Sequence, residues 1–203
     1  MDSQNTVQMN AKKIINIDRA NNCALNFYIE GSGPAAVALG KEPVELSHEY
    51  YNLFVTENES FKDDAPFLIS HEHLLQREMD PDLIRRFSTL SEEALEEICS
   101  FPCIFTCKKE HYGQADPDIP IHFGYIRKIK NLRSGVKIYP GYIRFPSVIS
   151  QLSLHNSLAE FDLWGDASIN ELDHVHWSIK RLNLMERLLE LNLITTDHWE
   201  DNQ

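Results

Sequence analysis

The chain contains no apolar run near the roughly 20 residues that a membrane-spanning helix needs, so we expect no contact with the membrane interior. Its opening segment, MDSQNTVQMNAKK, is polar and has no hydrophobic stretch typical of a secretory signal. Only four cysteines occur in 203 residues, whereas a secreted disulfide scaffold is shorter and richer in cysteine. These absences predict a soluble cytoplasmic protein with reduced thiols.

The chain is also poor in positive charge. It has 19 Lys and Arg against 31 Asp and Glu, and its formal net charge is -12, which on average repels nucleic acid and anionic membranes. Hydrophobic residues make up 42% and charged residues 25%, a composition typical of globular proteins. We expect a single domain over residues 1–203. A division into a β-rich lobe, 1–75, and a helix-hairpin-helix lobe, 76–203, remains open.

Common enzyme motifs are missing as well. The sequence contains no GxxxxGK[ST] or GxGxxG phosphate loop, no GxSxG nucleophile motif and no HExxH metal motif. The segment Gly31-Ser32-Gly33 is too short for a nucleotide loop. We therefore assign no catalytic residue and no cofactor, and a non-enzymatic role is favoured over an enzymatic one.

The first third of the chain has strand character. Short segments rich in β-branched and aromatic residues predict strands, and the segment Gly31–Pro34 interrupts them. The predicted strands are Ile14–Ile17, Leu25–Ile29, Val44–Leu46 and Tyr51–Val55.

The middle of the chain predicts two helices. Asp80 before Pro81 is typical of a helix start. A capping box from Thr89 to Glu92 predicts the start of the second helix, which Pro102 ends.

The last part mixes strands and helices. The predicted elements are a strand Cys103–Cys107, a hairpin of His122–Ile129 and Val136–Tyr139, a helix Pro146–Phe161 and a helix Trp177–Leu191. Together the elements predict an α+β fold, with a mostly antiparallel sheet or small partly open barrel and helices packed on one side.

The hairpin region, residues 121–145, lies in a segment without acidic residues that extends from Ile119 to Ala159. Alternation along strands allows Lys128, Lys130 and Lys137 to share one face with Arg127 on the other, although the cations need not all point one way. Tyrosines suited to base stacking lie among the cations. This predicts a surface for nucleic acid or an acidic partner; the alternative is a solvated face that pairs with acidic neighbours. The candidate residues are Arg127, Lys128, Lys130, Arg133, Lys137, Arg144, Tyr125, Tyr139 and Tyr142.

Two histidine pairs suggest a metal site. His71 with His73, and His174 with His176, are each spaced by two residues, which on a strand directs both imidazoles to one face. The alternative is that these segments are turns, where such a pair diverges and the histidines have ordinary capping or surface roles.

Residues 91–190 carry a partial resemblance. They combine a helix, the segment Ser100–Phe105, the strand Gly124–Ile129 and a final segment containing His176-Trp177 and Ile179-Lys180. This order is similar to a small module that accompanies TIR-type and other effector domains in bacterial, anti-phage proteins. The resemblance implies a partner-associated module with His176, Trp177 and Lys180 as its motif residues. The alternative for Trp177 is an aromatic anchor at the start of the last helix.

Three functional hypotheses follow. The first is a non-enzymatic binding or regulatory subunit of a bacterial defence assembly, with a protein partner and with nucleic acid as a further candidate ligand. The second is a metal-dependent hydrolase or nuclease that uses the two histidine pairs. The third is an acidic inhibitor or immunity-type protein that uses the carboxylates between Glu42 and Glu97, including Glu92, Glu93, Glu96 and Glu97.

Overall fold

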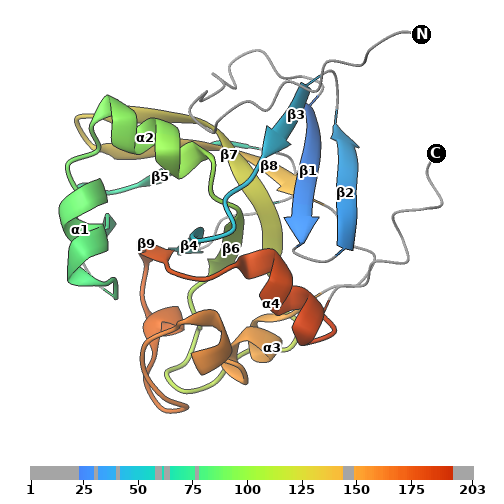
Figure 1. Cartoon of the computed structure of the whole chain (residues 1–203). Helices are drawn as coiled ribbons and strands as arrows, with labels where there is room; N and C mark the ends of the chain where they lie inside the picture. Colours follow the sequence, from blue (N-terminus) through green and yellow to red (C-terminus); the bar gives the residue numbers. More distant parts are fainter. Residues whose placement is uncertain are drawn as a thin grey trace, which may run out of the picture.

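The computed structural model describes residues 23–29, 32–39, 42–57, 61, 65–75, 78–143 and 149–193, with side chains from residue 46 onward. They form an α+β fold with two sheets (Figure 1). The predicted strand Ile14–Ile17, the helix start at Pro146 and Arg144 lie outside the described residues. In the described part of the chain, no helix is both long and apolar enough to span a bilayer.

The larger sheet has six strands in the order β5-β8-β7-β6-β4-β9. Neighbours are antiparallel, except that β4 and β6 are parallel, and the sheet does not close. The predicted α+β class with a mostly antiparallel sheet is thus confirmed. The strands are β4 (Tyr51–Thr56), β5 (Phe67–Ile69), β6 (Cys103–Cys107), β7 (His122–Leu132), β8 (Gly135–Ile143) and β9 (His176–Lys180).

The smaller sheet has the order β2-β1-β3, with strands β1 (Cys23–Ile29), β2 (Ser32–Leu39) and β3 (Glu42–Glu45). The predicted break at Gly31–Pro34 is shorter in the structure: β1 ends at Ile29 and β2 begins at Ser32, so Gly33 and Pro34 lie in a strand. Pro34 fits there because β2 is an edge strand and its pairing with β1 shifts register between Ile29 and Phe27. The sheets divide the chain near residue 46, since β4 and β5 belong to the larger one.

The strands β4, β6 and β9 of the larger sheet are buried on both faces. Along β4, Leu53 and Val55 belong to one hydrophobic cluster and Phe54 to the other. The ring of Phe54 stacks on Phe105 of β6 and on Trp177 of β9, with centroids 5.1 and 5.2 Å apart. Central strands of this sheet are therefore apolar on consecutive residues, as two-sided burial requires.

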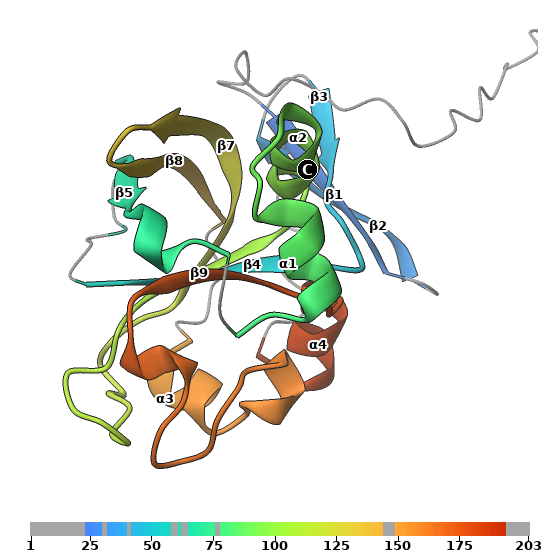
Figure 2. The same ribbon diagram turned by 90° about the vertical axis from the view of Figure 1, so that its left-hand side faces the viewer.

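The helices are α1 (Pro81–Phe87), α2 (Glu92–Cys99), α3 (Gln151–His155) and α4 (Leu184–Glu190), with 3₁₀ turns η2 (His71–His73), η3 (Ala159–Phe161) and η4 (Glu171–Asp173). Helices α1 and α2 pack in the cluster of Phe54, whereas α3 and α4 pack in the cluster of Leu53. Figure 2 shows them on opposite sides of β4 and β9. The helices therefore do not share one side, because each face of the sheet needs its own apolar cover.

Three helix predictions needed correction. The N-cap of α2 is Ser91, whose hydroxyl accepts from the Ala94 N–H at 3.3 Å, and not Thr89. In the predicted helix 146–161, α3 ends at His155 and a separate turn, η3, follows. The Ser157 N–H bonds back to Leu154 O, three residues earlier, which tightens the last turn and ends the helix.

The predicted helix 177–191 is in fact a strand followed by a helix. Trp177 lies in β9, and α4 begins only at Leu184, after Asn183, whose side chain accepts from the Glu186 N–H. The helical spacing of the leucines holds only after Arg181, whereas residues 176–180 alternate between polar and apolar as in a strand.

Candidate functional site

Strand β9 carries polar and apolar residues in alternation, and both sets are buried. Trp177 and Ile179 enter the cluster beneath α1 and α2. His176, Ser178 and Lys180 point to the opposite face and expose 3%, 0% and 2% of their surface. Because burial of charge is costly without partners, this polar row requires counter-groups from elsewhere in the chain.

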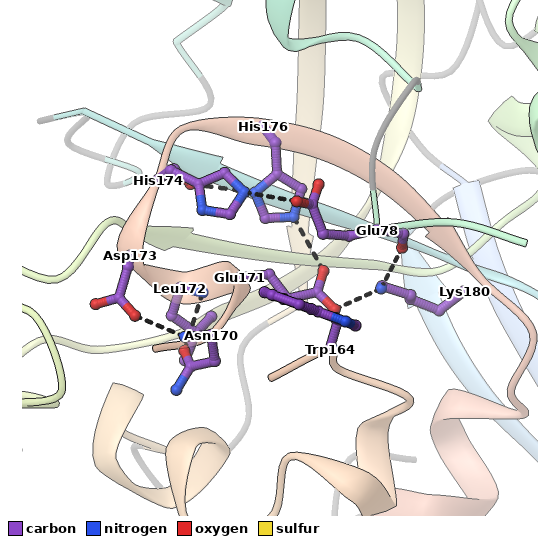
Figure 3. Close-up of polar contacts among 9 residues, drawn as sticks. All are labelled: Glu78, Trp164, Asn170, Glu171, Leu172, Asp173, His174, His176 and Lys180. Carbon is purple, nitrogen blue, oxygen red and sulfur yellow. Dashed lines mark hydrogen bonds and ion pairs between the residues drawn. The ribbon is translucent and has the colours of Figure 1, made fainter. Parts of the chain in front are cut away.

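Glu171 supplies the central counter-group (Figure 3). Its carboxylate accepts from Lys180 Nζ at 2.6 Å, from His176 Nε2 at 3.1 Å and from the backbone N–H of Trp164. Glu171 is fully buried. One carboxylate therefore joins two basic residues that lie four apart on β9.

The turn η4 holds Glu171 in place through a capping box. Asn170 Oδ1 accepts from the Leu172 N–H at 3.1 Å, and Asp173 Oδ2 accepts from the Asn170 N–H at 2.7 Å. Reciprocal caps of this kind fix the first residues of a helical turn. The position of Glu171 is thus set by local backbone geometry as well as by its ion pairs.

The imidazole of His176 has both nitrogens occupied. Nε2 lies 3.1 Å from Glu171 Oε2, and Nδ1 lies 3.1 Å from the backbone oxygen of His174. Both partner atoms are oxygens, so each ring nitrogen is engaged by a contact within the protein. His176 consequently has no free nitrogen for general-base chemistry or for metal binding.

Glu78 closes the network from the loop before α1. Its backbone oxygen accepts from Lys180 Nζ at 2.6 Å, and its Oε1 lies 3.0 Å from His174 Nε2. Burial acts to raise the pKa of Glu78, but the hydrogen bond from His174 and the charges of His176 and Lys180 outweigh it and hold this pKa below its usual value.

A second buried pair lies next to η4. Lys109 Nζ is 3.0 Å from Asp173 Oδ1, and both side chains are almost inaccessible to solvent. The Lys109 N–H also bonds to Leu172 O at 2.8 Å. These two contacts of Lys109 fix the loop after β6 to the turn that carries Glu171. Nearby, burial and the charge of Lys109 lower the pKa of His155, whose ring contacts Asn170.

The two predicted histidine pairs differ: the rings of His174 and His176 lie side by side, with centroids 5.0 Å apart, whereas His71 and His73 contact separate partners. His71 and His73 lie on the turn η2, where His71 Nε2 contacts Leu132 O at 3.0 Å and His73 faces Glu72. His174 and His176 contact Glu78 and Glu171 instead. Within the part of the chain that the structure describes, no group of three or more His, Cys, Asp or Glu side chains is arranged to hold a metal ion.

The predicted basic hairpin forms, and it presents a row of lysines. Lys130 lies directly opposite Lys137, and Lys128 directly opposite Tyr139. Cross-strand partners share a face, so these four residues define one surface, here called the lysine face. Both Lys130 Nζ and Lys137 Nζ lie near the ring of Tyr139, at 5.4 and 5.7 Å from its centroid.

A bulge in β7 creates this arrangement. Ile126 pairs with Pro140 and Lys128 with Tyr139, so Arg127 is an extra residue. The insertion resets the alternation, and Ile126 and Ile129 both point toward the same hydrophobic cluster. Pro140 suits a bulge because it has no N–H to donate to the ladder.

Other predicted binding residues have different surroundings. Arg127 Nε donates to Pro140 O at 2.7 Å. Tyr125 is buried and packs on Gly141, so it is not placed to stack on a base. Arg133 lies exposed at the turn. Tyr142 packs in the aromatic cluster with Phe105, which leaves Tyr139 as the tyrosine of the lysine face.

The motif residue Trp177 is structural. Its ring is buried, and its Nε1 donates to Asn52 Oδ1 at 3.0 Å. It anchors β9 rather than the start of a helix. Of the acidic residues of α2, Glu92, Glu93 and Glu96 are exposed, whereas Glu97 pairs with Arg86 at 2.5 Å.

Sequence reasoning identified Lys180, His174 and His176, but it missed Glu78 and Trp164 as neighbours. The signal that was available is the alternating segment His176–Lys180, in which polar residues every second position indicate a strand face that needs partners. Comparison with known proteins adds no assignment, because no family description, curated protein or solved structure matches the chain.

Proposed function

We propose that this protein is a non-catalytic binding module and that the lysine face of the β7–β8 hairpin binds single-stranded nucleic acid. The observation that carries the proposal is the direct pairing of Lys130 with Lys137. Like charges opposite each other on a sheet are destabilising. A polyanionic ligand would relieve this repulsion.

Within the described part of the chain, no carboxylate forms an ion pair with Lys130 or Lys137. Among the residues that the structure describes, the same is true of Arg133. In a chain of net charge -12, three cations without a carboxylate partner among the described residues are candidates to bind an external anion. The alternative interpretation, in which these lysines pair with acidic neighbours, therefore finds no support among the described residues at Lys130, Arg133 and Lys137.

The surface chemistry favours a single strand over an acidic protein. Lysines placed along a flat strand pair contact successive phosphates, and an aromatic ring between them accepts a stacked base. Tyr139 has that position, with two ammonium groups beside its ring. The overall negative charge predicts moderate affinity that depends strongly on salt.

The buried network supports a non-catalytic role. Lys180 and His176 both contact Glu171, and all three are removed from solvent, which suits a structural function better than proton transfer to a substrate. Together with the resemblance of residues 91–190 to an effector-associated module, this supports a regulatory subunit of a cytoplasmic bacterial defence assembly.

Fluorescence anisotropy with labelled single-stranded RNA, single-stranded DNA and duplex DNA over a salt series tests the proposal. The affinity is expected to fall steeply with salt, with a slope of about -0.7 per phosphate contact for single strands. Lys137→Ala should weaken binding and reduce the slope by about one such contact. The matched control is Lys108→Ala, which removes a surface lysine that already pairs with Glu57.

Lys130→Glu gives a sharper prediction, because it changes binding and stability in opposite directions. The new carboxylate would face Lys137, and an opposite-charge pair should raise the free energy of unfolding by about 0.5 kcal/mol relative to the native lysine pair. Nucleic-acid binding should be lost. Two outcomes would refute the proposal: a stabilised variant whose binding is unchanged, or wild-type protein that binds no nucleic acid at low salt. In either case, binding of an acidic peptide would then be measured.

A further inference from the structure

A pocket with a volume of ≈ 550 Å³ lies beside the buried network. Its lining comes from two segments far apart in the chain, the loop before α1 and the turn after η3, together with β9. The residues on which the argument depends are Glu78, Asp80, Asp162, Leu163, Trp164 and Lys180. The volume is within the range of pockets that hold small organic ligands.

The charge of this pocket is negative. Three lining residues are acidic, and Lys180, its basic residue, is already paired with Glu171. Burial raises the pKa of Asp162 and outweighs the charge of Lys180 and a backbone hydrogen bond at Arg181, which lower it; the carboxylates of Asp80 and Glu171 add a smaller increase. Carboxylates that repel one another in this way are stabilised by a positive ligand.

Trp164 supplies an aromatic surface. Its backbone N–H is held by Glu171, whereas its side chain is among the exposed large apolar groups, with 61% of the residue accessible. The residue also lines the pocket, so its indole ring is accessible to a ligand there. Beside carboxylates, an indole ring is well suited to bind an organic cation.

Glu78 shows an unmet contact at the same place. Its Oε1 meets His174, but its Oε2 is buried and has no hydrogen-bond donor among the described residues. A buried carboxylate oxygen without a donor is costly. Glu78 thus adds a negative charge to the pocket lining, with its carboxyl group turned toward His174.

From these observations we infer that the pocket binds an organic cation of the alkylammonium class, with its charge at the carboxylates and its apolar stem against Trp164 and Leu163. Such a group is found in free polyamines and in the lysine side chain of a protein partner. The inference concerns a different surface from the lysine face and does not depend on nucleic-acid binding.

Isothermal titration calorimetry with spermidine, putrescine and N-acetyl-lysine methylamide tests this inference, with 1,4-butanediol as the uncharged control. At least one amine should bind to the wild-type protein and the diol should not. Trp164→Ala and Asp162→Asn should each weaken amine binding by about five- to thirtyfold, as expected for loss of a cation–π or charged contact. Asn is suited to position 162, where φ is 55°.

The matched controls are Tyr112→Ala, which removes another exposed aromatic, and Asp118→Asn, which removes an exposed carboxylate outside the pocket; both should leave binding unchanged. Stronger binding of the polyamines would identify a free metabolite as the ligand, and stronger binding of the blocked lysine would identify a partner's side chain. Absence of amine binding at low salt, or equal losses in the pocket and control variants, would overturn the inference.

Discussion

At the scale of single residues, the main feature is the burial of charge around Glu171. Lys180 and His176 lie on one face of β9, and a lone charge there would carry a desolvation cost of several kcal/mol. Glu171 offsets this cost because it contacts both residues and a backbone N–H at once. Glu171 therefore holds η4 in one arrangement against β9.

Glu171→Gln should therefore be strongly destabilising, since it leaves Lys180 buried without its counter-charge. We expect a loss of about 3–5 kcal/mol in the free energy of unfolding, measured by urea denaturation. The double variant Glu171→Leu with Lys180→Met should recover much of that loss, because it removes both charges. Glu110→Gln, at an exposed position, is the control, and a Glu171→Gln variant as stable as this control would contradict the interpretation.

At the scale of elements, the β7–β8 hairpin depends on its turn and on its contact with β5. Gly135 has φ 148°, and a Cβ at this position would lie 2.1 Å from Ile69 O. Val136 pairs with Ile69 directly afterwards. The turn residue therefore allows β5 to lie close enough to extend the sheet, and it supports the strand that carries Lys137.

Gly135→Ala is expected to destabilise the protein by about 1–3 kcal/mol, because the backbone angle is strained for a residue with Cβ and the added atom meets β5. Thermal unfolding measures the loss, and hydrogen exchange should show it concentrated in β5 and β8. Ser134→Ala, in the same exposed turn, is the control. Equal stability of the two variants would show that β5 does not depend on Gly135.

At the scale of the whole molecule, Glu78 and His174 join the loop before α1 to the strand region 96 residues later. The buried pair of Lys109 with Asp173 ties the loop after β6 to η4, and the pair of Glu171 with Lys180 ties η4 to β9. Long-range polar contacts of this type make stability depend on pH as well as on packing.

The pKa of Glu78 is lowered in the folded state, so the ionised form stabilises the fold. This contribution is present above the usual pKa of a glutamate and is lost as the pH falls through the lowered value. Glu78→Gln should be less stable than wild type near neutral pH, and the difference should shrink below about pH 4.3. Urea midpoints from neutral to acidic pH measure it. A pH-independent difference would contradict the role of its charge.

Local patterns predicted much of the sheet. The strands β4 and β6 and the hairpin were found from their apolar and β-branched residues, and the acid-free segment indicated the lysine face. The bulge at Arg127 was not predicted, since an extra residue becomes visible only when Pro140 and Ile126 are paired. Tyr125 was also misjudged, because it was expected to be available for stacking whereas the pleat directs its side chain into a core.

The sequence by itself determined the α+β class, the acidic charge, the hairpin and the residues of the lysine face, because propensity, alternation and composition are properties of neighbouring residues. Only the tertiary structure decided that Trp177 lies in a strand and that Glu171 bonds to Lys180. It also decided that Asp162, Trp164 and Glu78 line one pocket. Those relations join segments separated along the chain, and their energies depend on burial, which no local pattern specifies.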